Sequence, residues 1–395
     1  MLSCWMILTQ NNKPMLKIIN NFVVKLLSFL ASLTIVSCND STTKPSCDNI
    51  AELEKLSNQG DVTSQANLAL CYYYGVGVTQ DLTKAFEWYR KAADQGHAAA
   101  QNNLGAKYLN GEGVTQDFSK AVNWFRRSAD QGHGAAQYNL GVLYANGDGV
   151  AQDLTKAFEW YRKAADQGDA DAQYSLGFQY DKGEGIIQDL TKAFEWYRKA
   201  ADQGNAFAQN NLGAKYLNGE GVAQDLTKAF EWYRKAADQG CTLAQHNLGL
   251  QYANGEGVAQ DLTKAVNWFS KAADQGHGAA QYNLGVLYAN GDGVAQDLTK
   301  AFEWYRKAAD QGYADAQHIL GVLYVNGEGV AQDFTKAAKW FRKATDQGHA
   351  DAQHILGILY TEGKGVTQDL TKAFEWFTKA ADQGHAAAQD NLKLK

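Results

Sequence analysis

Proline is almost missing from this 395-residue chain, and glycine is missing from its first part. Only 2 prolines occur, Pro14 and Pro45, whereas all 38 glycines lie at or after Gly60. Basic residues are also scarce, with 37 Lys and Arg against 43 Asp and Glu, for a formal net charge of −6. That balance excludes nucleic acid as an expected partner, because binding phosphates needs a basic face. Wholesale disorder is excluded too, since 45% of the residues are hydrophobic.

The first 37 residues have the order of a secretory signal peptide. They contain three lysines and no acid, and an uncharged apolar run, Leu26–Val36, comes before Ser37 and Cys38. A positive start, an apolar centre and small residues at the end are typical of such signals. The run has 11 residues, too few to span a bilayer, which needs about 20. We therefore expect residues 1–37 to be a signal peptide, with Met15 as the better start.

The end of this segment, Ile35-Val36-Ser37-Cys38, resembles the lipobox of bacterial lipoproteins. The resemblance implies that Cys38 is lipidated and becomes the N-terminus after cleavage, with residues 38–47 as a tether. Ordinary signal cleavage is the alternative. We expect the protein in the cell envelope of a bacterium, membrane-anchored and facing the periplasm, or extracellular if Cys38 carries no lipid.

A repeat of 36 residues fills most of the chain. An aspartate and a tryptophan recur at this spacing, beginning with Asp81 and Trp88. The aspartates are Asp81, Asp117, Asp153, Asp189, Asp225, Asp261, Asp297, Asp333 and Asp369. Nine units therefore occupy residues 61–384. Residues 48–60 and 385–395 look like half-units, which we expect to form capping helices at the two ends.

Each unit carries two helical patterns. In the first helix of the second unit, Ala100, Leu104 and Tyr108 lie four residues apart and form an apolar stripe. The second helix, from about Ala121 to Ala129, is apolar over half its circumference, too wide a face for one neighbour to cover. Helix pairs that bury their faces only against neighbours form a stack. The pattern predicts an all-α fold, an α/α solenoid (superhelix) of nine helix-turn-helix repeats.

The unit also resembles a known family. The segment Gln101-Asn102-Asn103-Leu104-Gly105-Ala106-Lys107-Tyr108, followed by Gly111-Glu112-Gly113-Val114 and Trp124, resembles the Sel1-like repeat, a relative of the tetratricopeptide repeat. The resemblance implies a solenoid whose first helices line a concave groove. It also implies a non-catalytic scaffold for protein–protein interaction, with an unknown protein or peptide as partner and with no cofactor or small-molecule substrate.

The groove positions follow from the same resemblance. One row lies two residues before the repeated Leu, and a second row lies one residue after the Gly that follows it. Because neither row belongs to the apolar stripe, we expect its aromatic and polar side chains to contact the partner. The candidate residues are Asn102, Tyr138, Tyr174, Phe178, Asn210, His246, Tyr282, His318 and His354.

Other motifs favour structure over chemistry. The nine Gly-x-Gly-Val segments follow a helix, not a strand, which indicates turns and not phosphate loops. Five histidines share one position at the start of a first helix, and side chains in such a row, one per repeat, cannot converge on a metal. In the other repeats Asp, Asn, Cys or Tyr occupies this position, which is typical of a helix cap. They are His97, His133, His277, His349 and His385. On the second helices, Glu87 and Lys91 begin a recurring pair four residues apart, which predicts a solvated face.

Cysteines and catalytic patterns complete the sequence reading. If the 48–60 helix folds back on the next helix, Cys47 comes near Cys71, and a disulfide can form in an oxidising compartment. Two free thiols are the alternative. No catalytic constellation is visible, so we expect no enzyme. The alternatives are an envelope hydrolase of β-lactams or peptidoglycan, by analogy with cysteine-rich Sel1-repeat proteins, and a secreted factor that acts on a host or competing cell.

Overall fold

The computed structural model describes residues 47–393, so the predicted signal peptide (1–37), Cys38 and most of the tether lie outside the described residues. Within residues 47–393 there are twenty helices and no strand. The strong helix–helix contacts join consecutive helices, as expected for a stack of hairpins. The prediction of an all-α solenoid is therefore confirmed. None of these helices is both long enough and apolar enough to cross a membrane.

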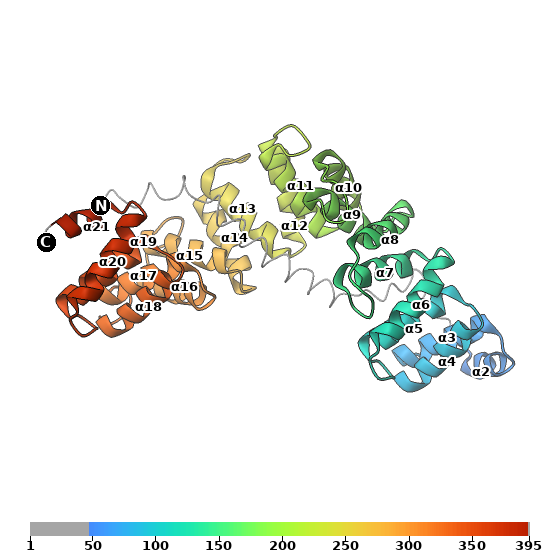
Figure 1. The fold of residues 1–395 in the computed structure, drawn as a ribbon. Coiled ribbons are helices and arrows are strands. Elements are labelled where there is room, and N and C mark those ends of the chain that lie inside the picture. Colours follow the sequence, from blue (N-terminus) through green and yellow to red (C-terminus); the bar gives the residue numbers. More distant parts are fainter. Residues whose placement is uncertain (1–46, 394–395) are drawn as a thin grey trace. The chain divides into compact units, whose positions relative to one another are not determined.

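The helices divide between two compact units, with the division in the chain after Gln203. Each unit is a series of helices in which every helix lies beside the next (Figure 1). The first unit contains α2 (Ile50–Asn58), α3 (Val62–Tyr74), α4 (Leu82–Asp94), α5 (Ala98–Asn110), α6 (Phe118–Asp130), α7 (Gly134–Asn146), α8 (Leu154–Asp166), α9 (Ala170–Lys182) and α10 (Leu190–Asp202). The second contains α11 (Ala206–Asn218), α12 (Leu226–Asp238), α13 (Thr242–Asn254), α14 (Leu262–Asp274), α15 (Gly278–Asn290), α16 (Leu298–Asp310), α17 (Ala314–Asn326), α18 (Phe334–Asp346), α19 (Ala350–Glu362), α20 (Leu370–Asp382) and α21 (Ala386–Lys393).

Odd-numbered helices from α3 onward are the first helices of the repeats, and even-numbered helices from α4 onward are the second helices. The predicted capping helix at 48–60 is α2, and the one at 385–395 is α21. α2 packs on α3, and α21 packs on α20, so each end of the array is covered by a single helix on the side where the next hairpin would stand.

The loops of each repeat are built as the sequence predicts. Asp117 caps α6, because its Oδ1 accepts a hydrogen bond from the Lys120 backbone N–H at 2.9 Å. Gly111 ends α5 in the left-handed conformation with φ of +72°. Gly113 also has positive φ, and a Cβ there would overlap the Leu82 carbonyl of the preceding repeat. The Gly-x-Gly segment is therefore a turn that also joins one repeat to the one before it.

From α5 to α19, a glycine inside the first helix of each repeat sets the distance between the two helices of a hairpin, whereas α3 has Ala69 at this position. A Cβ added at Gly105 would lie 2.9 Å from the Phe125 ring, and one at Gly141 would lie 2.6 Å from the Tyr161 ring. Real Cβ atoms do not approach so closely, so the ring of the second helix packs directly on the backbone of the first. A small residue therefore permits close packing of the two helices here.

The first helices are buried on more sides than the apolar stripe predicts. In α5 the stripe residues Ala100 and Leu104 are buried, as expected, but Gln101, Asn102 and Lys107 are buried as well. The reason is that α5 packs between the second helices α4 and α6, and that its Asn102 accepts a hydrogen bond from Asn139 of the next first helix, α7. The Lys107 ammonium is compensated by Glu112, whose Oε2 lies 2.6 Å away, and by the face of Tyr73.

The buried glutamine of each first helix forms a ladder that sequence reasoning missed. In α7, Gln137 donates from Nε2 to the Ala129 carbonyl at 3.2 Å, which satisfies the end of the preceding second helix. Its Oε1 accepts from Gln167 Nε2 at 2.7 Å. The same glutamine–glutamine bond joins Gln65 to Gln95, Gln101 to Gln131, Gln173 to Gln203, Gln209 to Gln239, Gln245 to Gln275, Gln281 to Gln311, Gln317 to Gln347 and Gln353 to Gln383.

Candidate functional site

The candidate groove residues all lie on first helices, one or two per repeat. The first unit carries Asn102 on α5, Tyr138 on α7, and Tyr174 and Phe178 on α9. The second unit carries Asn210 on α11, His246 on α13, Tyr282 on α15, His318 on α17 and His354 on α19. All but Phe178, which lies one turn later on α9, occupy the same turn of their helices, so the residues of one unit form a row across its hairpins.

Packing accounts for part of this row, against the expectation that the row stands outside the core. Asn102 and Asn210 are only 1% and 7% exposed, and both are therefore buried between repeats. The aromatic and histidine rings are partly buried, since each lies 5.7 to 5.9 Å from a ring on the second helix of its own hairpin. These pairs are Tyr138–Tyr161, Tyr174–Tyr197, His246–Phe269, Tyr282–Tyr305, His318–Phe341 and His354–Phe377.

Hydrogen bonds connect the row from one repeat to the next. Asn139 donates from Nδ2 to Asn102 Oδ1 at 3.1 Å, and Asn247 donates to Asn210 Oδ1 at the same distance. Asn283 and Asn391 make the equivalent contacts to the Nε2 atoms of His246 and His354, at 3.2 and 3.1 Å. The row therefore serves as a joint between repeats, and its partly exposed edges are what remains for a partner.

Burial also fixes the protonation of the row. It raises the pKa of the Tyr138 hydroxyl well above its usual range, with nearby Tyr161 and Asp171 adding to the effect. For His246, burial and the neighbouring His277 lower the pKa to about 3. At neutral pH these side chains therefore present a neutral surface of hydroxyl and imidazole groups, which suits hydrogen bonding to an uncharged or mixed ligand.

The five histidines at the starts of first helices are helix caps, as predicted. The Nδ1 of His97 accepts a hydrogen bond from the Ala100 backbone N–H at 3.1 Å, and the other four histidines do the same at 3.2 to 3.3 Å. Asp169 and Asn205 cap through side-chain oxygens, whereas Cys241 and Tyr313 make no side-chain cap bond. Among residues 47–393 no group of three or more His, Cys, Asp or Glu side chains could hold a metal.

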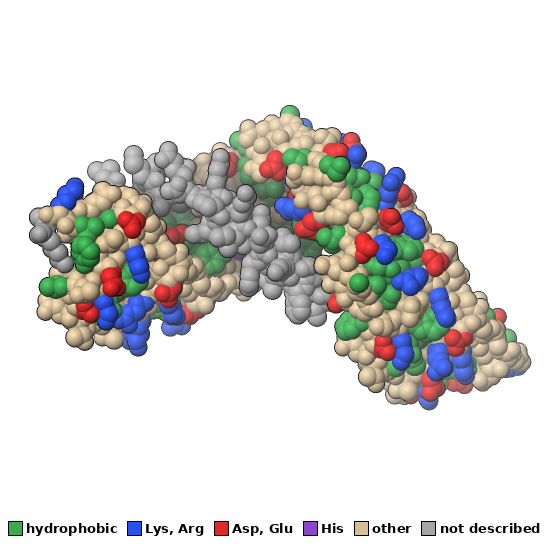
Figure 2. Space-filling view, in the orientation of Figure 1, with side chains coloured by type: hydrophobic (Ala, Val, Ile, Leu, Met, Phe, Trp, Pro, Cys, Tyr) green, Lys and Arg blue, Asp and Glu red, His purple; other side chains and the backbone are tan. Residues whose placement is uncertain are grey.

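A second surface follows the second helices, where tryptophan and lysine alternate. In eight of the nine repeats the lysine three residues after the tryptophan places its Nζ 3.7 to 4.1 Å from the ring centroid, and in the remaining one Arg127 lies over Trp124 with its Cζ at 4.6 Å. The pairs are Trp88–Lys91, Trp160–Lys163, Trp196–Lys199, Trp232–Lys235, Trp268–Lys271, Trp304–Lys307, Trp340–Lys343 and Trp376–Lys379. Figure 2 shows hydrophobic, basic and acidic side chains alternating over α4, α6, α8 and α10. The predicted solvated face is thus also a ladder of cation–π contacts.

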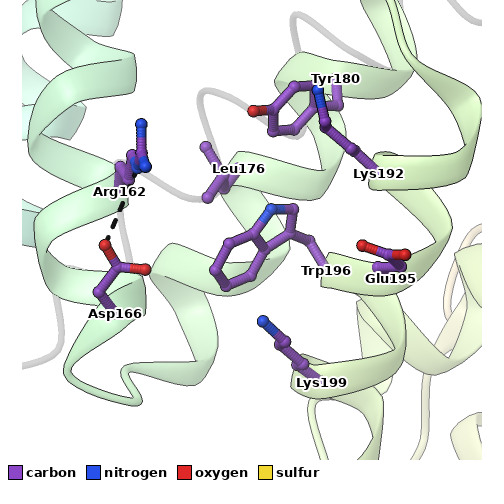
Figure 3. Close-up of a pocket in the computed structure, with 8 residues that line it drawn as sticks. All are labelled: Arg162, Asp166, Leu176, Tyr180, Lys192, Glu195, Trp196 and Lys199. Carbon is purple, nitrogen blue, oxygen red and sulfur yellow. Dashed lines mark ion pairs between the residues drawn. The ribbon is translucent and has the colours of Figure 1, made fainter.

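One hollow of this second surface has a volume of about 350 Å³. Trp196 of α10 lies at its centre, with Lys199 on one side and Lys192 with Tyr180 on the other (Figure 3). Arg162 and Asp166 of α8 close the opposite wall and form an ion pair of 3.9 Å. Lys192 pairs with Asp189 and Lys199 lies over the Trp196 ring, so the basic groups of this hollow already have partners within the protein.

The cysteines lie apart from both surfaces. Cys47 and Cys71 form a disulfide with a Cα–Cα distance of 6.1 Å, which ties the segment before α2 to α3. Cys241 is a buried free thiol at the start of α13, and burial raises its pKa, so it is a poor nucleophile. The predicted lipidation site, Cys38, lies outside the described residues.

Comparison with known proteins identifies the repeat. The model of the Sel1 repeat matches nine consecutive segments: 62–97, 98–133, 134–169, 170–205, 206–241, 242–277, 278–313, 314–349 and 350–385. A crystal structure described as a protective antigen present in uropathogenic Escherichia coli strains, displaying an SLR fold, is 39% identical with a TM-score of 0.68. That match covers 86% of this chain and 81% of the other.

A Sel1 repeat protein from Oxalobacter formigenes is also similar, with 38% identity and a TM-score of 0.59 over 78% of this chain and 89% of that one. A search among curated proteins returned no match. The matched segments begin one residue later than the units counted from the sequence, at residue 62 and not 61.

Proposed function

The chain belongs to the Sel1 repeat family, and on that premise we propose that it is a non-catalytic scaffold that binds a protein or peptide along its first helices. Sel1 repeat proteins are typically scaffolds for protein interactions, and stacked repeats offer extended surfaces for this purpose. The binding surface is the row of first-helix residues, used separately within each of the two units.

The observation that carries the proposal is variation on a fixed frame. The leucine two residues after the row is buried in every repeat, at 0 or 1% exposure from Leu104 to Leu356. The row itself changes between Asn, Tyr and His although the frame around it stays the same. Since all three residue types satisfy the same packing, packing alone does not require any particular one. Partly exposed Tyr and His side chains combine a large contact area with a polar tip, which suits peptide recognition.

A crosslinking experiment tests the surface. A photoreactive amino acid at position 178, on the first helix α9, should capture the partner in cells, whereas the same group at Glu195, on the second helix α10, should capture little. The captured protein should then bind the purified chain and lose affinity at least about tenfold in a variant with Tyr138→Asn and Tyr174→Asn. Asparagine already occupies the row at Asn102, so this variant should keep its fold.

The matched control removes charge from the other surface, with Lys163→Ala and Lys199→Ala. It should bind the partner as tightly as the unchanged protein. If the control loses binding and the tyrosine variant keeps it, the partner occupies the tryptophan–lysine face and the assignment of the groove is wrong. Circular dichroism of each variant would show whether the helices are retained.

We also propose that the scaffold is held in the bacterial cell envelope by a lipid on Cys38. The support is the order of residues 15–38, which is that of a signal peptide ending in a lipobox-like segment. Metabolic labelling with palmitate should mark the protein and should be lost in Cys38→Ala but not in Cys241→Ala. Release of an unlabelled, processed chain into the medium would instead favour a secreted protein.

A further inference from the structure

Two histidines from neighbouring repeats stack at the joint between residues 242–277 and 278–313. The ring of His246, on α13, lies with its centroid 4.6 Å from that of His277, which caps α15. Both rings also make the hydrogen bonds that join and cap the two repeats. The Nε2 of His246 meets the Asn283 amide Nδ2 of α15 at 3.2 Å, and the Nδ1 of His277 accepts from the Ala280 backbone N–H at 3.2 Å.

These hydrogen bonds define which ring nitrogens have to stay unprotonated. Because His277 Nδ1 accepts from a backbone N–H, its lone pair is engaged and the neutral ring carries its proton on Nε2. Because the Asn283 Nδ2 group is a donor, His246 Nε2 is the acceptor of that contact. A further proton on either ring therefore lands on an acceptor that holds the joint, or places a cation against its stacked neighbour.

Among residues 47–393, no carboxylate forms an ion pair or a hydrogen bond with either ring to compensate such a charge. The pKa of His246 is determined by its burial, by the neighbouring His277 and by a hydrogen bond with Asn247. The pKa of His277 is determined by its burial. From α14 the neighbour of His246 is the Phe269 ring, and from α15 it is Asn283. Burial accordingly lowers the pKa of His246 to about 3 and that of His277 to about 4.

Two further histidine pairs in the same unit differ from the first, because carboxylates face them. The carboxylates do not cancel the effect of burial, since burial and His349 still lower the pKa of His318 to about 4. His318 stacks on His349, whose Nε2 lies 3.3 Å from Asp315 Oδ1. His354 stacks on His385, whose Nε2 lies 3.1 Å from Asp351 Oδ1. At the first pair, the positions of Asp315 and Asp351 are taken by Leu243 and Ala279, which carry no charge.

We propose that the His246–His277 pair is an acid-sensitive joint, which opens between the repeats 242–277 and 278–313 when the pH falls and stays closed at neutral pH. Opening exposes both rings, so that they can take up protons at their ordinary pKa. It separates His246 from Asn283, releases the cap of α15, and thereby changes the first-helix surface of this unit. The inference does not depend on the identity of a partner.

The direction and size of the effect follow from linkage. Each histidine has a lower pKa in the closed joint than in the open one, where its ordinary pKa is near 6.5. Above about pH 6.5 it therefore favours the closed form, and this stabilisation of the closed form is lost as the pH falls toward the lowered pKa. For a ring shifted from 6.5 to about 4, opening becomes about 30-fold more favourable at pH 5 than at neutral pH. The two rings are in contact, so their effects are not multiplied.

Amide hydrogen exchange with mass spectrometry on the whole purified protein tests the joint, at about pH 7.5 and about pH 5 with rates corrected for intrinsic exchange. Protection of α13 and α15 should fall by at least about tenfold more than protection of α9, whose row and cap positions hold Tyr174 and Asp169 and no histidine. In the double variant His246→Tyr and His277→Asn the difference should disappear, because neither position then carries an imidazole and asparagine caps α11 at Asn205 in the same way. Each single variant removes one of the two rings and should reduce the acid response; His246→Tyr places the residue found at Tyr138.

The matched control is His318→Tyr, at a pair that carboxylates face, and it should leave the acid response of α13 and α15 unchanged. The proposal is overturned if acid loosens α9 as much as α13 and α15, or if the folded double variant retains the full acid response. Should the double variant fail to fold, the two single variants decide, and a full acid response in both overturns the proposal.

Discussion

A single methyl group added at two equivalent glycines should have opposite effects. Residues 131–168 and 275–312 are identical in sequence, so Gly134 and Gly278 begin α7 and α15 in the same local context. They differ only in what the following repeat places beside them. A Cβ at Gly134 would have the Gln167 side chain as its nearest neighbour, at 3.6 Å, whereas a Cβ at Gly278 would overlap the Tyr313 ring.

The magnitude follows from two opposing terms. Replacing glycine by alanine at a helical position stabilises by roughly 0.5–1 kcal/mol, through the smaller entropy of the unfolded chain. Overpacking costs about 1–3 kcal/mol. The Tyr313 ring cannot easily move aside, since it is partly buried and its hydroxyl accepts a hydrogen bond from the Ala279 backbone N–H. Gly134→Ala should therefore stabilise α7 slightly, whereas Gly278→Ala should destabilise the joint at α15 by about 1–2 kcal/mol.

Hydrogen exchange of the two helices measures this difference directly, because each stretch reports its own local opening. Gly278→Ala should lower the protection of α15 about tenfold, and Gly134→Ala should leave that of α7 unchanged or raise it. Adding Tyr313→Asn to Gly278→Ala should restore protection, since asparagine fills the same slot at Asn205. Equal effects of the two single variants, or no rescue by Tyr313→Asn, would show that the neighbouring repeat does not determine the cost.

Three further outcomes are expected from the packing. Gly141→Ala should destabilise by about 1–2 kcal/mol in urea unfolding followed by circular dichroism, because its Cβ would lie 2.6 Å from the Tyr161 ring; an unchanged midpoint would contradict the close approach. Gln137→Ala should lower the free energy of unfolding by about 1–3 kcal/mol, because the Ala129 carbonyl and Gln167 lose their hydrogen-bond partner. The exposed control Gln152→Ala should lower it by less than about 1 kcal/mol. Equal losses in the two variants would show that the glutamine ladder does not contribute to stability. Reducing the Cys47–Cys71 disulfide should destabilise α2 and α3 by about 3 kcal/mol, which should appear as faster amide hydrogen exchange in these two helices but not in α19. If exchange is unchanged although mass spectrometry verifies the reduction, packing alone holds α2 against α3.

The local elements could be predicted from the sequence because each depends on residues close together in the chain. The capping helix expected at 48–60 is α2, Ile50–Asn58, and Asp117 caps α6 through a backbone N–H three residues on. The Gly-x-Gly turn depends on positive φ at Gly111 and Gly113, which a side chain would disfavour. A repeated pattern of caps, stripes and turns thus specifies helical hairpins without any knowledge of their neighbours.

The candidate site could be predicted only in part. The row from Asn102 to His354 lies on first helices as expected, and its binding role stays a prediction. Its burial was not foreseen, because the stripe read from one helix says nothing of the other elements around it. Asn102, for example, meets Asn139 of the next repeat, a contact across 37 residues of sequence.

The sequence by itself determined the period, the helices with their caps and turns, and the stacking of hairpins, because a 36-residue unit exposes more apolar surface than it can cover alone. Only the tertiary structure decided which polar side chains are buried and paired: the glutamine ladder, the lysines on the tryptophans and the stacked histidines. The glutamine and histidine partners lie about 30 residues apart and meet only when one repeat is laid on the next. At these joints the residue of the neighbouring repeat, and not the local sequence, determines whether a glycine can be replaced by alanine. It also determines whether a histidine can accept a proton.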